Sequence, residues 1–390
     1  MSHVMNTYAR LPVAFSHGNG SRLTDTEGRT YLDGLSGIAV NTLGHNHPAL
    51  VAAISTQAAR LLHTSNIYRM PQQERLADKL AELSGMDEVF FCNSGCEANE
   101  AAIKLARFYG HRQGIDNPAI IVMEHSFHGR TLATLSATGS RKVQAGFEPL
   151  VAGFVRVPFN DLEAVRAIGE HNKNVVAVML EIVQGEGGVY VADLEYQRDL
   201  RRLCDENGWL MICDEVQCGM GRTGTWFGFQ HAGIRPDVVT LAKGLAGGVP
   251  IGACLAAGKA AWLFGPGNHG STFGGNQLAT TAALTTLEVI EQENLLVNAV
   301  SVGEVIREGL AQALADAPGV VGIRGMGLMI GIELDRPCGE LVQRGLDAGL
   351  LINVTAERVV RLLPALNFSA DEGRELVERL SALIRAFLSS

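Results

Sequence analysis

Residues 238–250 read VVTLAKGLAGGVP, an apolar run that ends at a lysine and then breaks into glycines. The run from Val238 to Ala242 predicts a buried strand, because it is short, apolar and bounded by turn-forming residues. Lys243 follows it directly, where the strand would reach the edge of a sheet. The glycines after Lys243 predict a tight turn in which a ligand can approach the backbone closely.

A second apolar run, from Trp209 to Cys213, ends at Asp214. In a parallel sheet the carboxyl ends of the strands meet at one edge, where open α/β sheets bind ligands. We therefore expect the Lys243 amine and the Asp214 carboxylate to lie at the same edge. A pyridoxal phosphate enzyme needs such groups, since the amine forms a Schiff base with the cofactor aldehyde and the carboxylate keeps the pyridine nitrogen protonated.

The composition is that of a folded globular protein with two domains. The length of 390 residues exceeds the ~250–300 residues at which single cores stop growing, so we expect one larger and one smaller domain. Apolar residues make up 47% of the chain and charged residues 19%, which excludes a disordered or fibrous protein. The net charge of −9 argues against general nucleic-acid binding, and local arginines would have to hold an acidic substrate.

The seven cysteines predict neither a disulfide framework nor a metal site, because they are odd in number and make no pair of CxxC motifs. The N-terminus lacks a basic segment followed by an apolar stretch. No apolar run approaches the ~18 residues that a membrane span needs. We therefore expect no metal, no membrane association and a reducing, cytoplasmic location.

Short apolar strands alternate with helical segments through the middle of the chain. This rhythm predicts right-handed βαβ units in a mainly parallel sheet that is covered by helices on both faces. The expected strands are 88–92, 119–123, 175–183, 209–213 and 238–242, and the expected helices are 97–109 and 196–207.

From about Leu278 the pattern changes to long helical periodicity, followed by strands at 328–334 and 359–363 and a terminal helix at 370–388. A small hairpin near Tyr31 could pack on this part. The predicted organisation is an N-terminal segment packing on the small domain, a large cofactor-binding domain and a small C-terminal domain, with the bounds 1–45, 46–277 and 278–390.

Residues 93–100, NSGCEANE, join a predicted strand to a predicted helix. Ser94 and Glu97 have capping-box spacing, and Gly95 lets the backbone approach a ligand closely. The helix N-terminus would then offer free N–H groups and a favourable dipole to a phosphate. Taken alone, this stretch is better explained as an ordinary capped helix, and it is the neighbouring motifs that favour a phosphate site.

Two further loops follow strands of the same predicted sheet. In residues 125–131, HSFHGRT, Phe127 could stack on a flat ring and Arg130 could clamp a carboxylate through its planar fork. In residues 184–188, QGEGG, the glycines could bring Glu186 into a pocket. Taken singly, a core aromatic, a solvated arginine and a plain turn are the competing explanations.

Residues 219–224, GMGRTG, match the GxGxxG pattern of dinucleotide sites. The residues that follow, TWFGF, are aromatic and broken by glycine, without helical periodicity. A dinucleotide site needs a helix at this point to hold the pyrophosphate, so the pattern does not predict one here.

The joint order of these motifs resembles that of the class III pyridoxal phosphate-dependent aminotransferases. The resemblance spans nearly the whole chain and rests on DEVQ with GMGRTG at 214–224, on the Lys243 segment and on GSTFGGN at 270–276. Within that class, residues 37–40, 43–45, 63–66 and 125–131 are most similar to the acetylornithine aminotransferases. The resemblance implies a fold-type I architecture, with a large domain whose mainly parallel sheet is flanked by helices and a smaller α+β C-terminal domain. It also implies a homodimer with shared active sites.

The resemblance implies pyridoxal 5'-phosphate as the cofactor and gives roles to matching residues. Lys243 would anchor the cofactor and shuttle protons, with a pKa lowered by burial among glycines. Asp214 would pair with the pyridinium nitrogen, and Gln217 would lie near the phenolic oxygen. The other implied cofactor contacts are Ser94, Gly95 and Cys96 at the phosphate, Thr272 of the partner subunit, Phe127 stacked on the ring, and His128, Glu215 and Val216.

Cys96 departs from the family pattern, in which threonine is usual at this position. The backbone N–H survives but the hydroxyl contact is lost, so the phosphate site is expected to be weaker.

For the substrates, the resemblance implies that Arg130, with Ser271 in the pocket, grips the carboxylate of N-acetylornithine. Arg361 would bind the α-carboxylate of glutamate or 2-oxoglutarate, and Glu186 would neutralise Arg361 while the amine substrate is bound. One site could then accept two unlike substrates in alternating half-reactions. A loop charge and a structural ion pair are the alternatives for Glu186 and Arg361.

The expected reaction moves the terminal amine of N-acetylornithine to 2-oxoglutarate, giving N-acetylglutamate 5-semialdehyde and glutamate in arginine biosynthesis. Rival donors are succinylornithine, N-succinyl-diaminopimelate, ornithine and 4-aminobutyrate, which pocket shape near Ile38, Ser65, Asn66 and Ser271 would distinguish. A racemase or decarboxylase of the same fold is a remoter alternative, and the Glu186–Arg361 pair argues against it. Another remote alternative is a catalytically inactive binding protein of this fold, and the presence of Lys243 and Asp214 argues against it.

Overall fold

The computed structural model describes residues 3–390, and its centre is a seven-stranded sheet, here called the central sheet. The strand order is β4-β12-β11-β10-β7-β5-β6. The strands are β4 (Glu88–Cys92), β5 (Ala119–Met123), β6 (Phe154–Val157), β7 (Val175–Glu181), β10 (Leu210–Asp214), β11 (Val238–Leu241) and β12 (Gly252–Ala256). Strand β12 is antiparallel to both neighbours, and the other pairs are parallel. The predicted mainly parallel sheet is therefore confirmed, with one antiparallel strand that the sequence pattern did not indicate.

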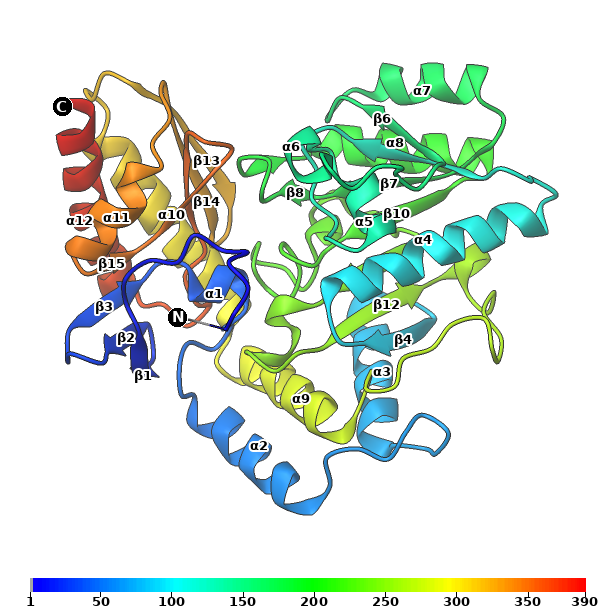
Figure 1. Ribbon diagram of the computed structural model, residues 1–390, viewed down its shortest axis with the longest axis horizontal. Helices are drawn as coiled ribbons and strands as arrows, with labels where there is room; N and C mark the ends of the chain where they lie inside the picture. The colour runs from blue at the N-terminus through cyan, green and yellow to red at the C-terminus, as the bar shows by residue number, and fades with distance from the viewer. Residues whose placement is uncertain (1–2) are drawn as a thin grey trace.

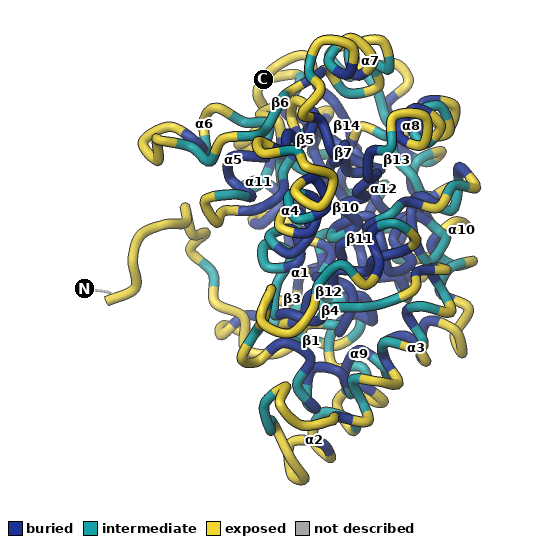
Figure 2. Tube along the Cα trace, turned by 90° about the vertical axis from the view of Figure 1, so that its right-hand side faces the viewer, coloured by how far each residue is buried: buried dark blue, intermediate teal, exposed yellow. Residues whose placement is uncertain are grey.

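Helices cover both faces of the central sheet (Figure 1). Helix α4 (Gly95–Arg112) packs on one face, where its side chains form a core cluster with Ile120 of β5. On the other face, α7 (Leu162–His171) and α8 (Leu194–Asn207) pack on the cluster that contains Ile121. Strands β5, β7, β10 and β11 are buried along their whole length, as expected of strands covered on both sides, and Figure 2 shows them as the dark centre of the molecule.

A second sheet, here called the C-terminal sheet, has the antiparallel order β13-β14-β17-β16. Its strands are β13 (Val320–Met326), β14 (Met329–Leu334), β16 (Asn353–Thr355) and β17 (Val359–Leu362). The helices on this side are α10 (Leu295–Ala313), α11 (Glu340–Asp347) and α12 (Ala370–Leu388). The terminal helix matches the predicted range, because Ser369 and Glu372 form a capping box that fixes its start.

The N-terminal hairpin pairs with a strand of this C-terminal part. Strands β1 (Phe15–Asn19), β2 (Arg22–Asp25) and β3 (Thr30–Asp33) form one sheet with β15 (Leu350–Leu351). The chain then passes through α1 (Ser36–Ala39), α2 (Pro48–Arg60) and α3 (Pro71–Ser84), and both longer helices pack on α9 (Gln277–Gln292). The remaining short elements are α5 (Leu132–Ala137), α6 (Arg141–Gln144), β8 (Val183–Gln184), β9 (Tyr190–Val191) and the 3₁₀ helices η1 (Gly228–Ala232), η2 (Lys243–Ala246) and η3 (Gly258–Ala260). The domain bounds predicted above stay a proposal.

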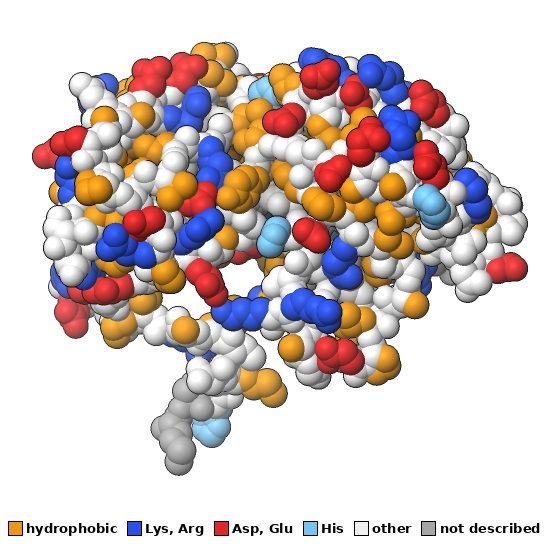
Figure 3. Space-filling view, turned by 90° about the horizontal axis from the view of Figure 1, so that it is seen from above, with side chains coloured by type: hydrophobic (Ala, Val, Ile, Leu, Met, Phe, Trp, Pro, Cys, Tyr) orange, Lys and Arg blue, Asp and Glu red, His pale blue; other side chains and the backbone are white. Residues whose placement is uncertain are grey.

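Side chains of both charges share one face of the molecule (Figure 3). Figure 3 shows acidic and basic side chains interspersed over one side of the molecule, without a continuous basic stripe. Among residues 3–390, no helix has the length and apolar character that crossing a membrane requires.

Candidate active site

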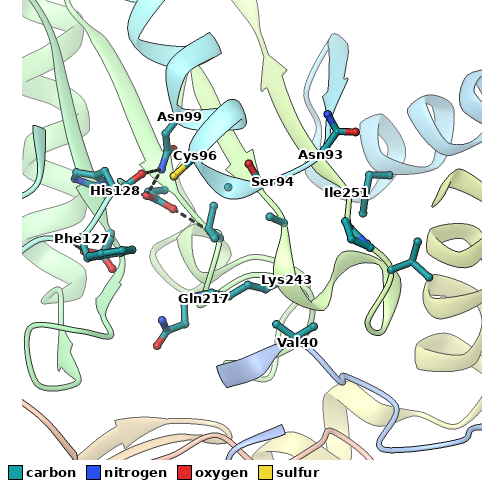
Figure 4. Close-up of a pocket in the computed structure, with 18 of the residues that line it drawn as sticks. Val40, Asn93, Ser94, Cys96, Asn99, Phe127, His128, Gln217, Lys243 and Ile251 are labelled. Carbon is teal, nitrogen blue, oxygen red and sulfur yellow. Dashed lines mark hydrogen bonds and ion pairs between the residues drawn. The ribbon is translucent and has the colours of Figure 1, made fainter. Parts of the chain in front are cut away.

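A cavity of about 380 Å³ lies at the carboxyl ends of β7, β10 and β11. This is the edge at which the sequence placed the chemistry. Its wall contains nine of the predicted site residues, namely Ser94, Gly95, Cys96, Phe127, His128, Asp214, Val216, Gln217 and Lys243. Figure 4 shows Ser94 and Cys96 at the start of α4 on one side of the cavity and Lys243 with Gln217 on the other.

Lys243 begins a short 3₁₀ turn directly after β11. Its φ of 40° lies in the left-handed region, which costs a non-glycine residue roughly 1–3 kcal/mol and marks a position held by its surroundings. Part of that support comes from Thr42, whose hydroxyl donates to the carbonyl of Gly244 at 2.8 Å. Burial lowers the pKa of the Lys243 amine, as predicted, so the amine loses its proton more readily near neutral pH.

Asp214 is buried and its carboxylate is held by donors on three sides. Oδ2 accepts a hydrogen bond from Asn99 Nδ2 and another from His128 Nδ1, both at 2.7 Å. Oδ1 accepts the backbone N–H of Val216 at 3.0 Å. The Thr240 hydroxyl donates to Asn99 Oδ1 at 2.7 Å, which fixes the amide in turn. The carboxylate therefore has one orientation, as a group that must meet a ring nitrogen requires.

His128 is fully buried against Asp214. Burial alone would lower the pKa of His128, but the hydrogen bond and charge of Asp214 outweigh it and raise that pKa. A protonated imidazole keeps its Nδ1–H directed at the carboxylate. The sequence indicated His128 but gave no sign of Asn99, because an asparagine inside a helix has no distinguishing local pattern.

The first turn of α4 has the geometry of an anion site. Ser94 is the N-cap and accepts the N–H of Glu97 at 3.2 Å. The N–H groups of Gly95 and Cys96 have no partner within the helix, and the dipole of this 18-residue helix favours a negative charge there. A Cβ on Gly95 would lie 2.7 Å from Val216 Cγ1, so glycine is required for the close approach.

The Cys96 thiol contacts the loop at residues 129–130. Its Sγ accepts the N–H of Arg130 at 3.1 Å. A Cβ on Gly129 would lie 2.4 Å from Sγ, so the loop passes the thiol without room for another side chain. Cys96, the residue that departs from the family pattern, therefore lies beside the helix N-terminus and within the cavity wall.

Phe127 is fixed by a carboxylate that the sequence analysis did not single out. The backbone N–H of Phe127 donates to Glu181 Oε1 at 2.8 Å. Glu181 ends β7 opposite Asp214 in the strand register and lines the same cavity. Burial raises the pKa of Glu181 to about 7. The guanidinium carbon of Arg130, which is exposed, lies 5.6 Å from the centre of the Phe127 ring. In the sequence, Glu181 could have been identified by its position as a charged residue at the end of a buried strand.

Glu186 and Arg361 form the ion pair that the sequence placed beside the substrate. Arg361 Nη1 lies 2.6 Å from Glu186 Oε1 and also donates to Gln217 Oε1 at 3.1 Å. Arg361 Nε donates to Asn353 Oδ1 at 3.1 Å, whereas Nη2 is buried with no hydrogen-bond partner. Burial would raise the pKa of Glu186, but the charge and hydrogen bond of Arg361 outweigh it and lower that pKa. Gln217 connects this pair to the cavity wall.

Six predicted site residues lie outside the cavity wall: Arg130, Glu186 and Arg361, described above, and Glu215, Ser271 and Thr272. Glu215 is buried and accepts the backbone N–H groups of Gly228 at 2.8 Å and Phe229 at 2.9 Å, so it holds a neighbouring 3₁₀ turn. Burial raises the pKa of Glu215 to about 7. Ser271 accepts from Asn93 Nδ2 at 3.1 Å and, like the exposed Thr272, lines a separate hollow.

Comparison with known proteins places the whole chain in one family. Residues 4–384 match the family model described as Aminotransferase class-III. Acetylornithine aminotransferase of Nitrosomonas europaea is 62% identical over 390 residues, which cover 100% of this chain and 99% of that protein. Acetylornithine aminotransferase 1 of Bordetella bronchiseptica is 61% identical over 388 residues, with the same coverage.

Solved structures agree with the predicted fold. The ornithine aminotransferase from Toxoplasma gondii ME49 matches with a TM-score of 0.95 at 33% identity, over 99% of this chain and 93% of that chain. N-acetylornithine aminotransferase from Stenotrophomonas maltophilia K279a matches with a TM-score of 0.85 at 37% identity, over 98% of each chain. Both the fold and the predicted family are confirmed, and this chain belongs to the class III aminotransferases.

Proposed function

We propose that this aminotransferase moves the terminal amine of N-acetylornithine to 2-oxoglutarate, a step of arginine biosynthesis that gives N-acetylglutamate 5-semialdehyde and glutamate. The relatives at 61% and 62% identity bear the name acetylornithine aminotransferase. The observation that carries the proposal is the ion pair of Glu186 with the buried Arg361, which lets one site change its charge.

The cavity fits pyridoxal 5'-phosphate by the chemistry of its donors. The free N–H groups at the start of α4 suit the phosphate, and the oriented Asp214 carboxylate suits a protonated ring nitrogen. Phe127 offers an aromatic face, held by Glu181 through the backbone. Lys243 offers an amine of lowered pKa. When bound, this cofactor supplies an electron sink for the carbon that loses a proton.

Lys243 is the group we expect to carry that proton. It lies half-buried in the cavity wall, and its lowered pKa brings it toward the range in which a base works at neutral pH. Its neighbours Glu186 and Asp214 would raise the pKa of the amine, and burial outweighs them. The lysine can therefore accept and return a proton without leaving the cavity.

The two substrates would use the same cavity in turn. With Glu186 on Arg361 the arginine charge is neutralised, and the terminal aminomethylene end of the amine donor, which carries no carboxylate, can lie nearby. The carboxylate of that donor would reach Arg130, which is exposed beside Phe127. For glutamate or 2-oxoglutarate, Glu186 would swing toward solvent, since 37% of its side chain is exposed. Arg361 would then pair its free Nη2 with the α-carboxylate.

We also propose that the enzyme works as a cytoplasmic homodimer. The loops at 61–68 and 271–274 lie against each other, since Asn66 Nδ2 donates to the carbonyls of Ser271 and Gly274 at 3.0 Å. Large apolar side chains stand exposed on these loops, namely Leu61, Leu62, Ile67, Tyr68 and Phe273. Such a patch favours a second copy, which would bring Thr272 of the partner subunit to the phosphate. All seven cysteines are free, as a reducing compartment allows.

A donor screen with 2-oxoglutarate as the acceptor tests the proposed reaction. We expect the highest kcat/KM with N-acetylornithine, above succinylornithine, N-succinyl-diaminopimelate, ornithine and 4-aminobutyrate. A higher kcat/KM for any of these rivals would replace the proposed donor while leaving the aminotransferase chemistry in place. Light scattering of the purified protein at micromolar concentration tests the dimer, and a monomer would contradict it.

A further inference from the structure

Four residues lie in one row across the C-terminal sheet. In the strand register Arg324 of β13 is opposite Gly331 of β14, Gly331 is opposite Arg361 of β17, and Arg361 is opposite Asn353 of β16. Residues directly opposite each other share a face of the sheet. This face therefore carries two arginines, with a position between them that has no side chain.

Residues 186–190, here called the switch segment, lie on that row. Arg324 Nη2 donates to the carbonyl of Gly188 at 2.6 Å, and its Nε donates to the carbonyl of Val189 at 3.2 Å. A Cβ on Gly331 would lie 2.9 Å from Val189 Cβ, so the missing side chain is what makes room for Val189. Figure 1 shows the hairpin that begins with β8 reaching toward β13 and β14.

The other end of the switch segment is fixed on the same face. Thr355 follows Asn353 by two residues on β16 and donates to the carbonyl of Glu186 at 2.5 Å. The Glu186 carboxylate lies on Arg361 at 2.6 Å. The backbone of the segment is thus held at Glu186, Gly188 and Val189, whereas the Glu186 side chain is held by the ion pair with Arg361.

Arg324 is itself immobilised. Its guanidinium carbon lies 3.8 Å from the centre of the Tyr190 ring, and its Nη1 pairs with Glu333 Oε2 at 2.5 Å. The Tyr190 hydroxyl donates to the same Glu333 oxygen at 3.1 Å. The contacts on Arg324 therefore come from both the switch segment and the sheet, which fastens one to the other.

We propose that Arg324 and Gly331 are positioning residues that determine substrate choice by fixing the backbone of the switch segment on the C-terminal sheet. This inference rests on the proposed function, since it takes Glu186 as the group that masks Arg361. Because both the segment and Arg361 are tied to one sheet, Glu186 exposes Arg361 by turning its side chain and not by moving the loop. A shift of the loop away from the sheet would lengthen the 2.6 Å contact between Glu186 and Arg361.

Two glycines of the same sheet give a matched pair of variants. Gly331→Ala places a methyl group against Val189 and should push the switch segment away from the sheet. Gly322→Ala adds the same methyl group on β13, where a Cβ would meet no atom within 4 Å. Any general cost of replacing a strand glycine is therefore shared, and only Gly331→Ala should disturb Glu186.

A second pair of variants tests the same point without crowding the sheet. Arg324→Gln removes the guanidinium that holds the carbonyls of Gly188 and Val189. Arg358→Gln removes a different arginine, which pairs with the other oxygen of Glu333 at 2.7 Å. Both lose one ion pair to Glu333, and Arg324→Gln alone should loosen the switch segment.

The experiment measures kcat/KM for the N-acetylornithine and glutamate half-reactions of the holoenzyme separately, with melting temperatures alongside. For Gly331→Ala and Arg324→Gln we expect the ratio of kcat/KM for N-acetylornithine to kcat/KM for glutamate to fall at least about five-fold. Glu186→Ala should lower the same ratio. Gly322→Ala and Arg358→Gln should stay within about two-fold of the wild type. Adding Glu186→Ala to either positioning variant should lower the ratio no further than Glu186→Ala alone, because the same mask is already lost.

The outcomes separate the inference from the proposed function. If Glu186→Ala lowers the ratio but Gly331→Ala and Arg324→Gln leave it unchanged, the positioning role is wrong and the proposed function stands. Equal losses in both half-reactions, or a further fall in the double variants, would also overturn the positioning role. If Glu186→Ala itself leaves the ratio unchanged, the proposed function is wrong, and the inference fails with it.

Discussion

Arg361 has no exposed side-chain surface, whereas Glu186, whose Oε1 lies 2.6 Å from Arg361 Nη1, keeps 37% of its side chain exposed. The cation of this pair cannot move into solvent, but its partner can. In the proposed mechanism, the charge presented to a ligand is therefore set by the position of one side chain. A site of this kind can accept an uncharged group and a carboxylate at the same place in turn.

Lys243→Ala should abolish turnover, with a loss of several orders of magnitude, while the protein stays folded. The amine is the only group in the cavity wall suited both to anchor an aldehyde and to carry the proton. Steady-state rates and circular dichroism check the two halves of this prediction. Lys142→Ala, which removes an exposed lysine, is the control. Transamination by Lys243→Ala at a rate near the wild type would show that another group does this work.

Asp214→Asn should lower kcat by at least a few orders of magnitude, because a neutral amide cannot keep a ring nitrogen protonated. The amide would also present an N–H group to Asn99 or His128, which now donate to Oδ2. Rates and the absorbance spectrum of the bound cofactor as a function of pH measure the effect. Activity comparable to that of the wild type would point to a different partner for the ring nitrogen.

Cys96→Thr should tighten the binding of pyridoxal phosphate by about three- to ten-fold, since one added hydrogen bond contributes ~0.5–1.5 kcal/mol. The residue lies in the first turn of α4 and lines the cavity. Equilibrium titration of the cofactor-free protein, followed by absorbance, gives the dissociation constant. Cys96→Ala is the control, because it removes the thiol without adding a hydroxyl. Unchanged affinity in Cys96→Thr would mean that the side chain does not reach the phosphate.

The sequence predicted the strands that carry the site because each is a continuous apolar run that ends at a polar residue. Lys243 and Asp214 follow such runs, and the structure brings them to one cavity. It did not indicate β12, since Gly252–Ala256 consists mainly of small residues and does not stand out as a strand. The parallel rhythm of its neighbours also gave no hint of an antiparallel member.

Contacts between distant segments were not predictable for a different reason. The row of Arg324, Gly331 and Arg361 depends on the register of three strands. That register could not be predicted from a single sequence. Glu181 lies inside the long predicted strand 175–183, so the sequence did not mark it as a site residue. In the strand register it lies opposite Asp214. Asn99 lies within a helix, where its contact with Asp214 depends on how that helix packs on the sheet.

Glu181→Gln should change how stability depends on pH. Burial raises the pKa of Glu181 from 4.5 to about 7, so the folded protein keeps a proton that the unfolded chain releases in this window. The stability contributed by this group is complete below pH ~4.5 and is lost as the pH rises through ~7. Glutamine has no proton to lose and can still accept the N–H of Phe127.

Urea unfolding of the cofactor-free protein at several pH values tests this. The free energy of unfolding of Glu181→Gln, relative to the wild type, should rise by up to about 3 kcal/mol between pH ~4.5 and ~7.5, at ~1.4 kcal/mol per unit of pKa. Glu170→Gln, which changes an exposed carboxylate of α7, should show no such rise. A difference that stays constant with pH would contradict the raised pKa of Glu181.

In the proposed mechanism, Glu186 masks Arg361 for one substrate and releases it for the other. Single-turnover absorbance changes of the bound cofactor, recorded separately with N-acetylornithine and with glutamate, test it most directly. Glu186→Ala leaves the buried charge of Arg361 without its partner, so it should lower the preference for N-acetylornithine over glutamate by about ten-fold or more. Arg361→Ala should impair chiefly the glutamate half-reaction and leave the N-acetylornithine half-reaction largely intact. Equal losses in both half-reactions for both variants would contradict the claim.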